Sequence, residues 1–406
     1  MEVPATFERI DQDRSPITIV GAGPAGLACA IVLARAGYRV AVREQRDRVG
    51  GRFHGDFQGL ENWSCDEDVI EELRRSGIDP TFESHAVYHG VAFDAQGTRF
   101  DISDRSPLYY LVRRGWDRGT LDHALLQQAK ALGVDVRFGD RVKDADGMTI
   151  LAGGPRTADA IAVGYVFDTD IADGAWVCFD NKLAPLGYAY LLVHAGSGTV
   201  ATCLFTDFKR EAHYLACTVA AFKDRVGLRM TNARQFGGYA NFRLPRTAVQ
   251  GGHPIVGEQA GFQDALAGFG IRFALRSGVL AARSIIERTD YTALWRRELL
   301  PFLKAAVSNR FIFNNLGERG SRWVLAHWLQ GTDARRALRS LYGASSWTRL
   351  LFPIARWRYR AQLEDKSCDH QQCTCVWCEC SATEQGPRPG WAGVESQGRP
   401  VSHARS

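Results

Sequence analysis

The pattern of apolar and polar positions near the N-terminus predicts a strand, a helix and a second strand in close succession. Residues 17–20 form a short β-branched run, which is typical of a buried parallel strand. Residues 27–36 are mostly apolar and are followed by Gly37, a residue type that commonly ends helices. Residues 38–42 predict the second strand. This order predicts a β-α-β unit with parallel strands.

Later patterns predict a second group of elements with a different pairing. Helices are expected at residues 121–131, 210–225 and 272–288, and strands at residues 134–138, 160–168, 175–179, 188–194 and 198–205. The last four strands are joined by turn-rich segments, which favours antiparallel pairing. Residues 294–357 are predicted to be helical.

The segment between the first strand and the first helix carries the strongest chemical signal. It reads Gly21-Ala22-Gly23-Pro24-Ala25-Gly26. In such a loop the first glycine permits the turn, the second lets a pyrophosphate reach the backbone, and the third lets helix and strand pack closely. The helix N-terminus then offers free N–H groups to the phosphates. The spacing predicts a dinucleotide site.

An acid at the end of the second strand supports this interpretation. Glu44 lies 18 residues beyond Gly26, where it can accept hydrogen bonds from the adenosine ribose hydroxyls. Its charge argues against a 2′-phosphate at this position.

The next segment indicates FAD. Residues 48–52 read Arg-Val-Gly-Gly-Arg, and here the chain resembles the large superfamily of FAD enzymes with a double-glycine, arginine-flanked segment after the glycine loop. The resemblance implies that Gly50, Gly51 and Arg52 lie along the FAD pyrophosphate or ribityl chain.

Two further segments complete the expected flavin site. Arg118 stands four residues before Asp122 at a predicted helix start, as in flavin hydroxylases and reductases. Arg113 and Arg114 compete for the same flavin-facing role, and the sequence leaves the choice open. Residues 148–154 resemble the strand that returns to the glycine loop, with Gly153 near its end.

A later stretch is similar to the geranylgeranyl reductase family and to aromatic hydroxylases. It contains Gly257-Glu258 and ends in Gly268-Phe-Gly270-Ile271. The resemblance implies that Glu258 binds the ribityl hydroxyls and that Gly268, Gly270 and Ile271 lie beside the isoalloxazine ring. Glu258 replaces the usual Asp, and Ala265 replaces the usual Pro of these families.

The substrate site is expected between the flavin segments. Residues 187–192 resemble a Gly-Tyr-x-Trp-x-Phe segment of geranylgeranyl reductases, and Tyr188 and Tyr190 share one strand face. They are interpreted either as pocket aromatics or as simple core residues. The Trp-x-Trp-x-Ile-Pro signature of flavin halogenases is absent from the sequence, which argues against that class.

These patterns predict an α/β fold with a Rossmann-type FAD-binding domain, an inserted antiparallel-sheet substrate domain and a helical C-terminal region. The expected boundaries are residues 1–55, 108–159 and 246–290 for the FAD domain, 56–107 and 160–245 for the substrate domain, 291–366 for the helical region, and 367–406 for a Cys-rich, disordered tail. The resemblance implies an FAD-dependent reductase of an apolar, isoprenoid-like substrate. An aromatic monooxygenase is the alternative, and a flavin-bound electron carrier or redox sensor is the second alternative.

The C-terminal part raises two further questions. Residues 347–359 mix arginines with bulky apolar residues, which suits either a membrane surface or a helix packed on the protein, and Pro353 weakens the amphipathic helix. Five cysteines and one histidine lie within residues 368–380, which suits zinc or an iron–sulfur cluster, and equally a redox-active or lipid-modified tail or a disordered tail without a function. The five candidate ligands are Cys368, Cys373, Cys375, Cys378 and Cys380.

Composition and charge limit the partners and the cellular location that are expected, but they do not identify a substrate. The chain has 406 residues, 45% of them hydrophobic, and a net charge of +5, which implies no nucleic-acid partner. No apolar run reaches membrane-spanning length and the first residues do not resemble a signal peptide, so a cytoplasmic protein is expected. A single dinucleotide fingerprint leaves the electron donor open between NAD(P)H bound transiently and another protein.

Overall fold

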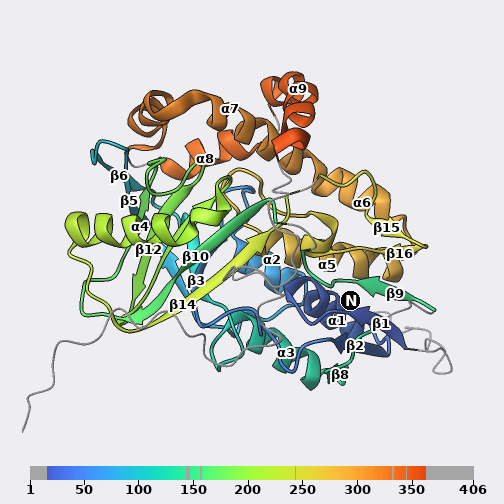
Figure 1. The fold of residues 1–406 in the computed structure, drawn as a ribbon. Coiled ribbons are helices and arrows are strands. Elements are labelled where there is room, and N and C mark those ends of the chain that lie inside the picture. The colour runs from blue at the N-terminus through green and yellow to red at the C-terminus, as the bar shows by residue number, and fades with distance from the viewer. Residues whose placement is uncertain are drawn as a thin grey trace, which may run out of the picture.

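The computed structural model describes residues 16–142, 147–155, 158–242, 244–331, 333–343 and 345–362. Three parts are visible: a parallel sheet with its helices, a larger mixed sheet, and a group of C-terminal helices (Figure 1).

A four-stranded parallel sheet contains the N-terminal β-α-β unit. Its strand order is β8-β2-β1-β9, and every neighbouring pair is parallel. Its strands are β1 (Ile17–Val20), β2 (Val40–Glu44), β8 (Asp135–Phe138) and β9 (Thr149–Leu151). Strand β1 lies between β2 and β9, so the glycine loop that follows β1 emerges at the centre of the sheet edge.

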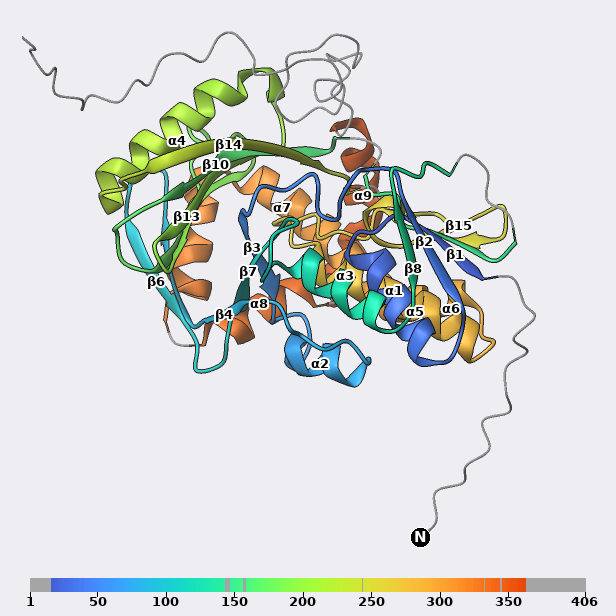
Figure 2. The same ribbon diagram turned by 90° about the horizontal axis from the view of Figure 1, so that it is seen from below.

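Helices pack beside this sheet (Figure 2). Helix α1 (Pro24–Arg35) packs against both α3 (Leu121–Ala131) and α5 (Ile271–Ile286). Its apolar residues are almost wholly buried, which explains why a mostly apolar segment of this length forms a core helix. Helix α6 (Tyr291–Glu298) and the hairpin of β15 (Val249–Gln250) and β16 (His253–Pro254) complete this part.

A seven-stranded sheet forms the second part, in the order β14-β10-β13-β12-β11-β5-β6. Its strands are β5 (His89–Phe93), β6 (Arg99–Ser103), β10 (Ala160–Asp168), β11 (Gly174–Cys178), β12 (Tyr188–His194), β13 (Ser197–Leu204) and β14 (Thr231–Ala240). All pairs are antiparallel except β5 with β11. That parallel pair joins two stretches that are far apart in the sequence into one sheet.

Helix α4 (Glu211–Val226), preceded by the short turn η1 (Phe208–Arg210), covers one face of this sheet. Its buried Phe222 packs with Leu191 and Val200 of the sheet. Along β12 the inward residues Ala189, Leu191 and Val193 alternate with Tyr188 and Tyr190, because successive strand side chains point to opposite faces. The face opposite α4 is therefore free to line a cavity.

A three-stranded antiparallel sheet lies between the two larger ones, in the order β3-β7-β4. It consists of β3 (Phe57–Glu61), β4 (Ser84–Val87) and β7 (Tyr109–Arg113), with the short helix α2 (Val69–Arg75) nearby. Strand β7 leads directly into the loop before α3 and thus positions the arginines at its end.

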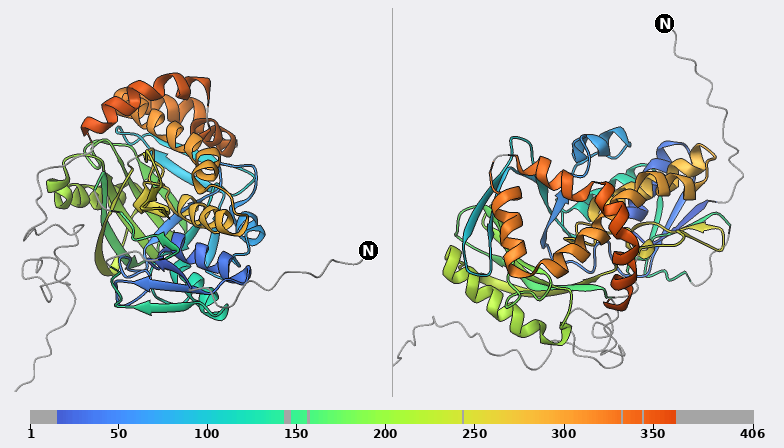
Figure 3. Two further views of the ribbon diagram at one scale, coloured as in Figure 1. Left: turned by 90° about the vertical axis from the view of Figure 1, so that its right-hand side faces the viewer. Right: turned by 90° about the horizontal axis from the view of Figure 1, so that it is seen from above.

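The C-terminal helices lie on the side of the molecule away from the parallel sheet (Figure 3). They are α7 (Leu300–Val324), the π-helical segment η3 (Leu325–Leu329), α8 (Ala334–Tyr342) and α9 (Ser346–Gln362). Gly317 interrupts α7 with φ of +61° and ψ of −174°, which bends the chain there. No helix among the described residues is long and apolar enough to span a bilayer.

The predicted fold class is confirmed, since the parallel sheet, the antiparallel strands and the helical C-terminal region are all present. Predicted residues 121–131, 160–168 and 188–194 coincide with α3, β10 and β12. The sequence did not predict β14 or the strands of residues 56–107. Several of those strands are short or partly exposed, so their apolar pattern is weak.

Candidate flavin and substrate site

One large cavity, of about 570 Å³, runs between the glycine loop and the C-terminal helices. Its walls come from the ends of β1 and β2, from the seven-stranded sheet, from the loop before α5 and from α7 and α8. The volume lies in the range that is typical of ligand pockets, roughly 300–1,000 Å³.

Close approach between backbones explains two of the glycines. A Cβ on Gly21, which has a φ of +112°, would lie 2.2 Å from the Ala152 carbonyl oxygen. A Cβ on Gly26 would lie 2.1 Å from the Gly21 carbonyl oxygen. At Gly23, in contrast, nothing lies within 4 Å of an added Cβ, and the residue lines the cavity together with Pro24 and Ala25. The open space at Gly23 fits a pyrophosphate at the N-terminus of α1.

Glu44 lies at the end of β2 and lines the same end of the cavity. Its carboxylate accepts hydrogen bonds from the backbone N–H groups of Ala22, at 2.8 Å, and Arg46, at 2.9 Å. These bonds hold the carboxylate beside the glycine loop, where it has further lone pairs for ribose hydroxyls.

The double-glycine segment also lies on the cavity wall, with Gly50, Gly51 and Arg52 among the lining residues. A Cβ on Gly50 would lie 2.6 Å from the Gly115 carbonyl oxygen, so this position requires glycine. Arg52 Nη1 lies 3.2 Å from Glu258 Oε2, and Arg52 Nη2 donates to the Tyr239 carbonyl at 2.9 Å. Two residues predicted independently for the flavin site thus contact each other.

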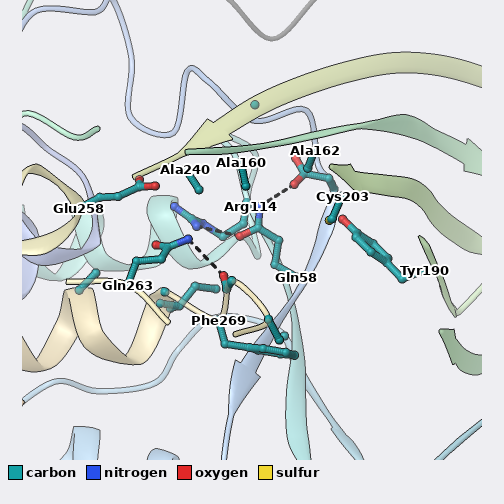
Figure 4. A pocket seen from close by; sticks show the side chains of 18 of the residues that line it. Gln58, Arg114, Ala160, Ala162, Tyr190, Cys203, Ala240, Glu258, Gln263 and Phe269 are labelled. Carbon is teal, nitrogen blue, oxygen red and sulfur yellow. Dashed lines mark hydrogen bonds between the residues drawn. The ribbon is translucent and has the colours of Figure 1, made fainter. Parts of the chain in front are cut away.

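The structure separates the three competing arginines. Arg114 is buried, lines the cavity and donates twice to Asp122, at 2.8 Å each. It also donates to Gln58 Oε1 at 3.1 Å (Figure 4). Arg113 pairs with Glu83, and Arg118 is exposed and does not line the cavity. The Arg118 interpretation therefore has no geometric support, because Asp122 points to the end of β7 rather than to the preceding turn.

The returning strand β9 brings Gly153 to the cavity. The Gly153 N–H donates to Gln259 Oε1 at 2.6 Å. This bond ties the end of β9 to η2 (Gly257–Ala260), which carries Glu258. This hydrogen bond therefore holds the end of the returning strand β9 next to Glu258.

The loop that enters α5 forms another wall. Gly268 has a φ of +78°, and a Cβ on Gly270 would lie 2.0 Å from Gln263 Oε1. Gln263 Nε2 in turn donates to the Gly268 carbonyl at 3.2 Å (Figure 4). Gly268, Gly270 and Ile271 all line the cavity at the N-terminus of α5. The positive end of the α5 dipole thus faces the cavity, where it favours negative charge on a bound group.

Sequence reasoning missed an aromatic cluster beside this loop. The rings of Trp63 and Phe269 have centroids 4.7 Å apart, and Trp63 lies 5.3 Å from Tyr342. All three line the cavity. In the sequence, Phe269 lies between Gly268 and Gly270, and this position is the signal that could have placed its ring in the site.

A buried carboxylate was also missed. Asp56 is 1% exposed and lines the cavity, where it accepts from the His54 N–H at 3.0 Å and from Gln58 Nε2 at 2.8 Å. Through Gln58 it is connected to Arg114. No motif marks this position in the sequence.

Tyr188 and Tyr190 lie on the wall formed by the seven-stranded sheet, with ring centroids 6.2 Å apart. The Tyr188 hydroxyl donates to the Ala267 carbonyl of the loop before α5. Burial raises the pKa of both phenols well above the usual value, so both rings stay neutral. Burial also raises the pKa of the neighbouring Cys203 thiol to about 12.

The far end of the cavity is apolar. It is lined by side chains of β5, β11, the residue that follows β11, α7, η3 and α8, namely Val91, Trp176, Phe179, Phe313, Leu316, Val324, Leu325, Leu329, Leu338 and Leu341. Such a chamber favours an apolar ligand.

The predicted metal ligands, Cys368 to Cys380, lie outside the described residues. Within the described ranges, no group of three or more His, Cys, Asp and Glu side chains is arranged to hold a metal ion.

Comparisons with known proteins give matches in sequence over part of the chain and in fold over most of it. Residues 19–62 match the family model of the NAD(P)-binding Rossmann-like domain. The chain is 28% identical over 211 residues to a 3-(3-hydroxy-phenyl)propionate/3-hydroxycinnamic acid hydroxylase of Mycobacterium sp. (strain JLS), a match over 46% of this chain and 35% of the hydroxylase. In each of the first curated relatives, the match covers less than half of the relative's length.

Solved structures show the likeness over most of the chain. A geranylgeranyl bacteriochlorophyll reductase-like protein from Thermoplasma acidophilum superposes with a TM-score of 0.64 at 15% identity, over 86% of this chain and 96% of that one. The flavin-dependent brominase Bmp2 superposes with a TM-score of 0.57 at 15% identity, over 85% and 98%. The chain therefore shares the fold of these two proteins, with a Rossmann-like domain at its N-terminal end.

Proposed function

We propose that the protein is an FAD-dependent oxidoreductase that acts on a small apolar substrate. The observation that carries this proposal is the continuity of the cavity, which runs from the glycine loop past Arg52 and Glu258 to the apolar chamber. A cofactor at one end and a substrate at the other would meet beside the loop before α5.

Successive residues along the cavity wall match successive parts of an FAD molecule. The open space at Gly23 suits the pyrophosphate, Glu44 suits the ribose, and Arg52 with Glu258 suits the ribityl hydroxyls. Gly268, Gly270 and Ile271 would lie beside the ring. When bound, FAD supplies a two-electron redox centre at its isoalloxazine ring.

The side chains around the chamber would position the substrate and handle protons. The apolar residues of α7 and η3 exclude water from the chamber. Tyr188 and Tyr190 keep their protons and present neutral phenols. Asp56 is a buried carboxylate of the cavity wall that has no arginine of the described ranges bound to it directly, and it would exchange a proton with the substrate.

The first candidate reaction is reduction of a carbon–carbon double bond in an isoprenoid-like substrate. The apolar chamber supports it, as does the sequence resemblance of residues 257–271 to geranylgeranyl reductases. The two electrons would come from NAD(P)H or from a donor protein, because the chain carries a single dinucleotide fingerprint.

The second candidate is an aromatic monooxygenase, in which reduced flavin reacts with oxygen. The hydroxylase match over 211 residues favours it. Both candidates use the same cofactor site, since function depends on the site and not on the fold.

Two measurements test the proposal. The visible spectrum of the purified protein should show bound flavin; a colourless protein that takes up no added FAD would overturn the proposal. Reduced protein should then be mixed with geranylgeraniol in the absence of oxygen and, in a separate experiment, with a phenol in air-saturated buffer. Reoxidation by the alkene with formation of the saturated product supports reduction, whereas substrate-dependent oxygen uptake with the phenol supports oxygenation.

A further inference from the structure

Helix α9 presents large apolar side chains to solvent. Four of them are strongly exposed: Trp347 (80%), Leu350 (73%), Ile354 (56%) and Trp357 (74%). Their spacing of three, four and three residues places them on one face of the helix. We call these four side chains the α9 stripe.

The opposite face of α9 is already used for packing. Thr348 and Ala355 are buried, and Ala355 and Phe352 pack with Phe311 of α7. The helix therefore has two apolar faces, of which only one is covered within the described part of the chain. Single exposed apolar residues are common, but a continuous stripe with two tryptophans is typical of an interaction surface.

Pro353 does not break this helix, contrary to the weakening expected from the sequence. Helix α9 runs continuously from Ser346 to Gln362 with Pro353 inside it. Pro353 is itself exposed, so the helix turn that lacks its N–H faces solvent and not the protein core. The stripe consequently stays on one face along the whole helix.

The charge on α9 indicates the kind of partner. The helix contains four arginines and no acidic residue. Of these, Arg349 and Arg356 are exposed and seven residues apart, which places them together on one flank of the stripe. A second copy of the chain on this face would bring arginine close to arginine, whereas an anionic surface would attract both.

The neighbouring segment exposes aromatic residues as well and also borders the cavity. Trp323 and Trp328 are 52% and 45% exposed. Leu316, Val324 and Leu325, in the same part of the chain, line the apolar chamber. Helix α7 and segment η3 are therefore the wall between the chamber and the C-terminal surface, near the interruption of α7 at Gly317.

We propose that the α9 stripe and its flanking arginines dock the protein onto the surface of a bilayer that contains anionic lipids. Tryptophan and aliphatic side chains enter the interfacial layer, and arginines contact the headgroups. The chamber would then open towards the source of an apolar substrate. That last step rests on the proposed function, whereas the docking does not.

The test uses the full chain with bound cofactor and lipid vesicles in a flotation assay. Vesicles of phosphatidylcholine with about a third phosphatidylglycerol should carry the protein upward, and pure phosphatidylcholine should carry much less. Trp347→Gln/Trp357→Gln should weaken binding at least about tenfold, because two interfacial anchors are lost. Arg349→Gln/Arg356→Gln should weaken it mainly at low salt.

A control variant tests whether loss of any exposed apolar side chain would weaken vesicle binding. Met148→Gln removes an apolar residue that is 53% exposed beside the parallel sheet and should leave binding unchanged. Flavin content and melting temperature should be unchanged in all variants, since every altered side chain is exposed.

Several outcomes would overturn the proposal. One is failure of the full chain to float with anionic vesicles, including the case in which only a chain ending at Gln362 floats, which would show that the tail covers the stripe. Another is equal flotation of the double tryptophan variant. A third is dimerisation of the wild-type protein that the tryptophan changes abolish, which would assign the stripe to a second copy.

Discussion

Arg52 and Glu258, 206 residues apart in the chain, form an ion pair with 3.2 Å between Nη1 and Oε2. Their side chains are 27% and 19% exposed and both line the cavity. The ion pair joins the double-glycine segment to η2 along the cavity wall. Because each residue belongs to a different predicted flavin segment, their contact supports a single binding site.

Removal of this pair should weaken FAD binding more than it weakens the fold. For Arg52→Met or Glu258→Gln we expect a loss of about 1 kcal/mol in unfolding free energy, because the pair is partly solvated. Loss of a charge-assisted hydrogen bond to the cofactor should raise the Kd for FAD about tenfold or more. Titration of apoprotein by flavin fluorescence measures the affinity, and urea unfolding measures the stability. Unaltered affinity in both variants would show that neither side chain holds the cofactor.

Substitution at Gly23 should block the cofactor site without disturbing the loop. Since no atom lies within 4 Å of an added Cβ, Gly23→Val can fold, but its side chain occupies the space assigned to the pyrophosphate. The purified variant should be colourless and keep the wild-type circular dichroism spectrum. A yellow variant with full FAD content would refute the assignment of this loop.

The two arginines before α3 should differ strongly. Arg114→Met leaves Asp122 buried without its charged partner, so we expect about 3–5 kcal/mol loss of unfolding free energy. Arg118→Met is the matched control at an exposed position and should change stability by no more than about 0.5 kcal/mol. Urea unfolding checks both. Similar losses in the two variants would contradict the arrangement of this loop.

Alkaline pH should destabilise the protein through its buried phenols. Burial raises the pKa of Tyr188 and Tyr190 above their value of about 10 in the unfolded chain. Below pH about 10 both states carry the protons and stability is unaffected; above it the unfolded state loses protons first, so stability falls as pH rises. Unfolding of wild type and of Tyr188→Phe/Tyr190→Phe across this pH range measures the effect. The double variant should show a shallower loss.

The cysteine-rich tail offers a prediction that rests on the sequence alone. If residues 368–380 bind zinc or an iron–sulfur cluster, purified protein should contain the metal in a stoichiometric amount. A chain ending at Asp365 should lose the metal and keep its flavin. Metal analysis of both chains decides the matter, and a metal-free full chain purified under reducing conditions would exclude the site.

Elements whose signals are local could be predicted without the structure. Within residues 21–26, Gly21 and Gly26 are required because the backbones approach closely there. The glycine spacing alone therefore identified the loop as a dinucleotide-binding loop, without knowledge of the segments that pack against it. Helix α3 and strands β10 and β12 were predicted at their observed bounds because strong apolar periodicity marks them.

Which side chains contact each other depends on how distant segments fold together. The sequence left the choice between Arg113, Arg114 and Arg118 open, and in the structure the direction of β7 places Arg114 against Asp122. Asp56 carries no motif and becomes a cavity residue through the sheet contacts around it. The exposure of Trp347 and Trp357 likewise depends on which face of α9 packs on α7. Burial and contact are properties of distant segments brought together, and no local pattern encodes them.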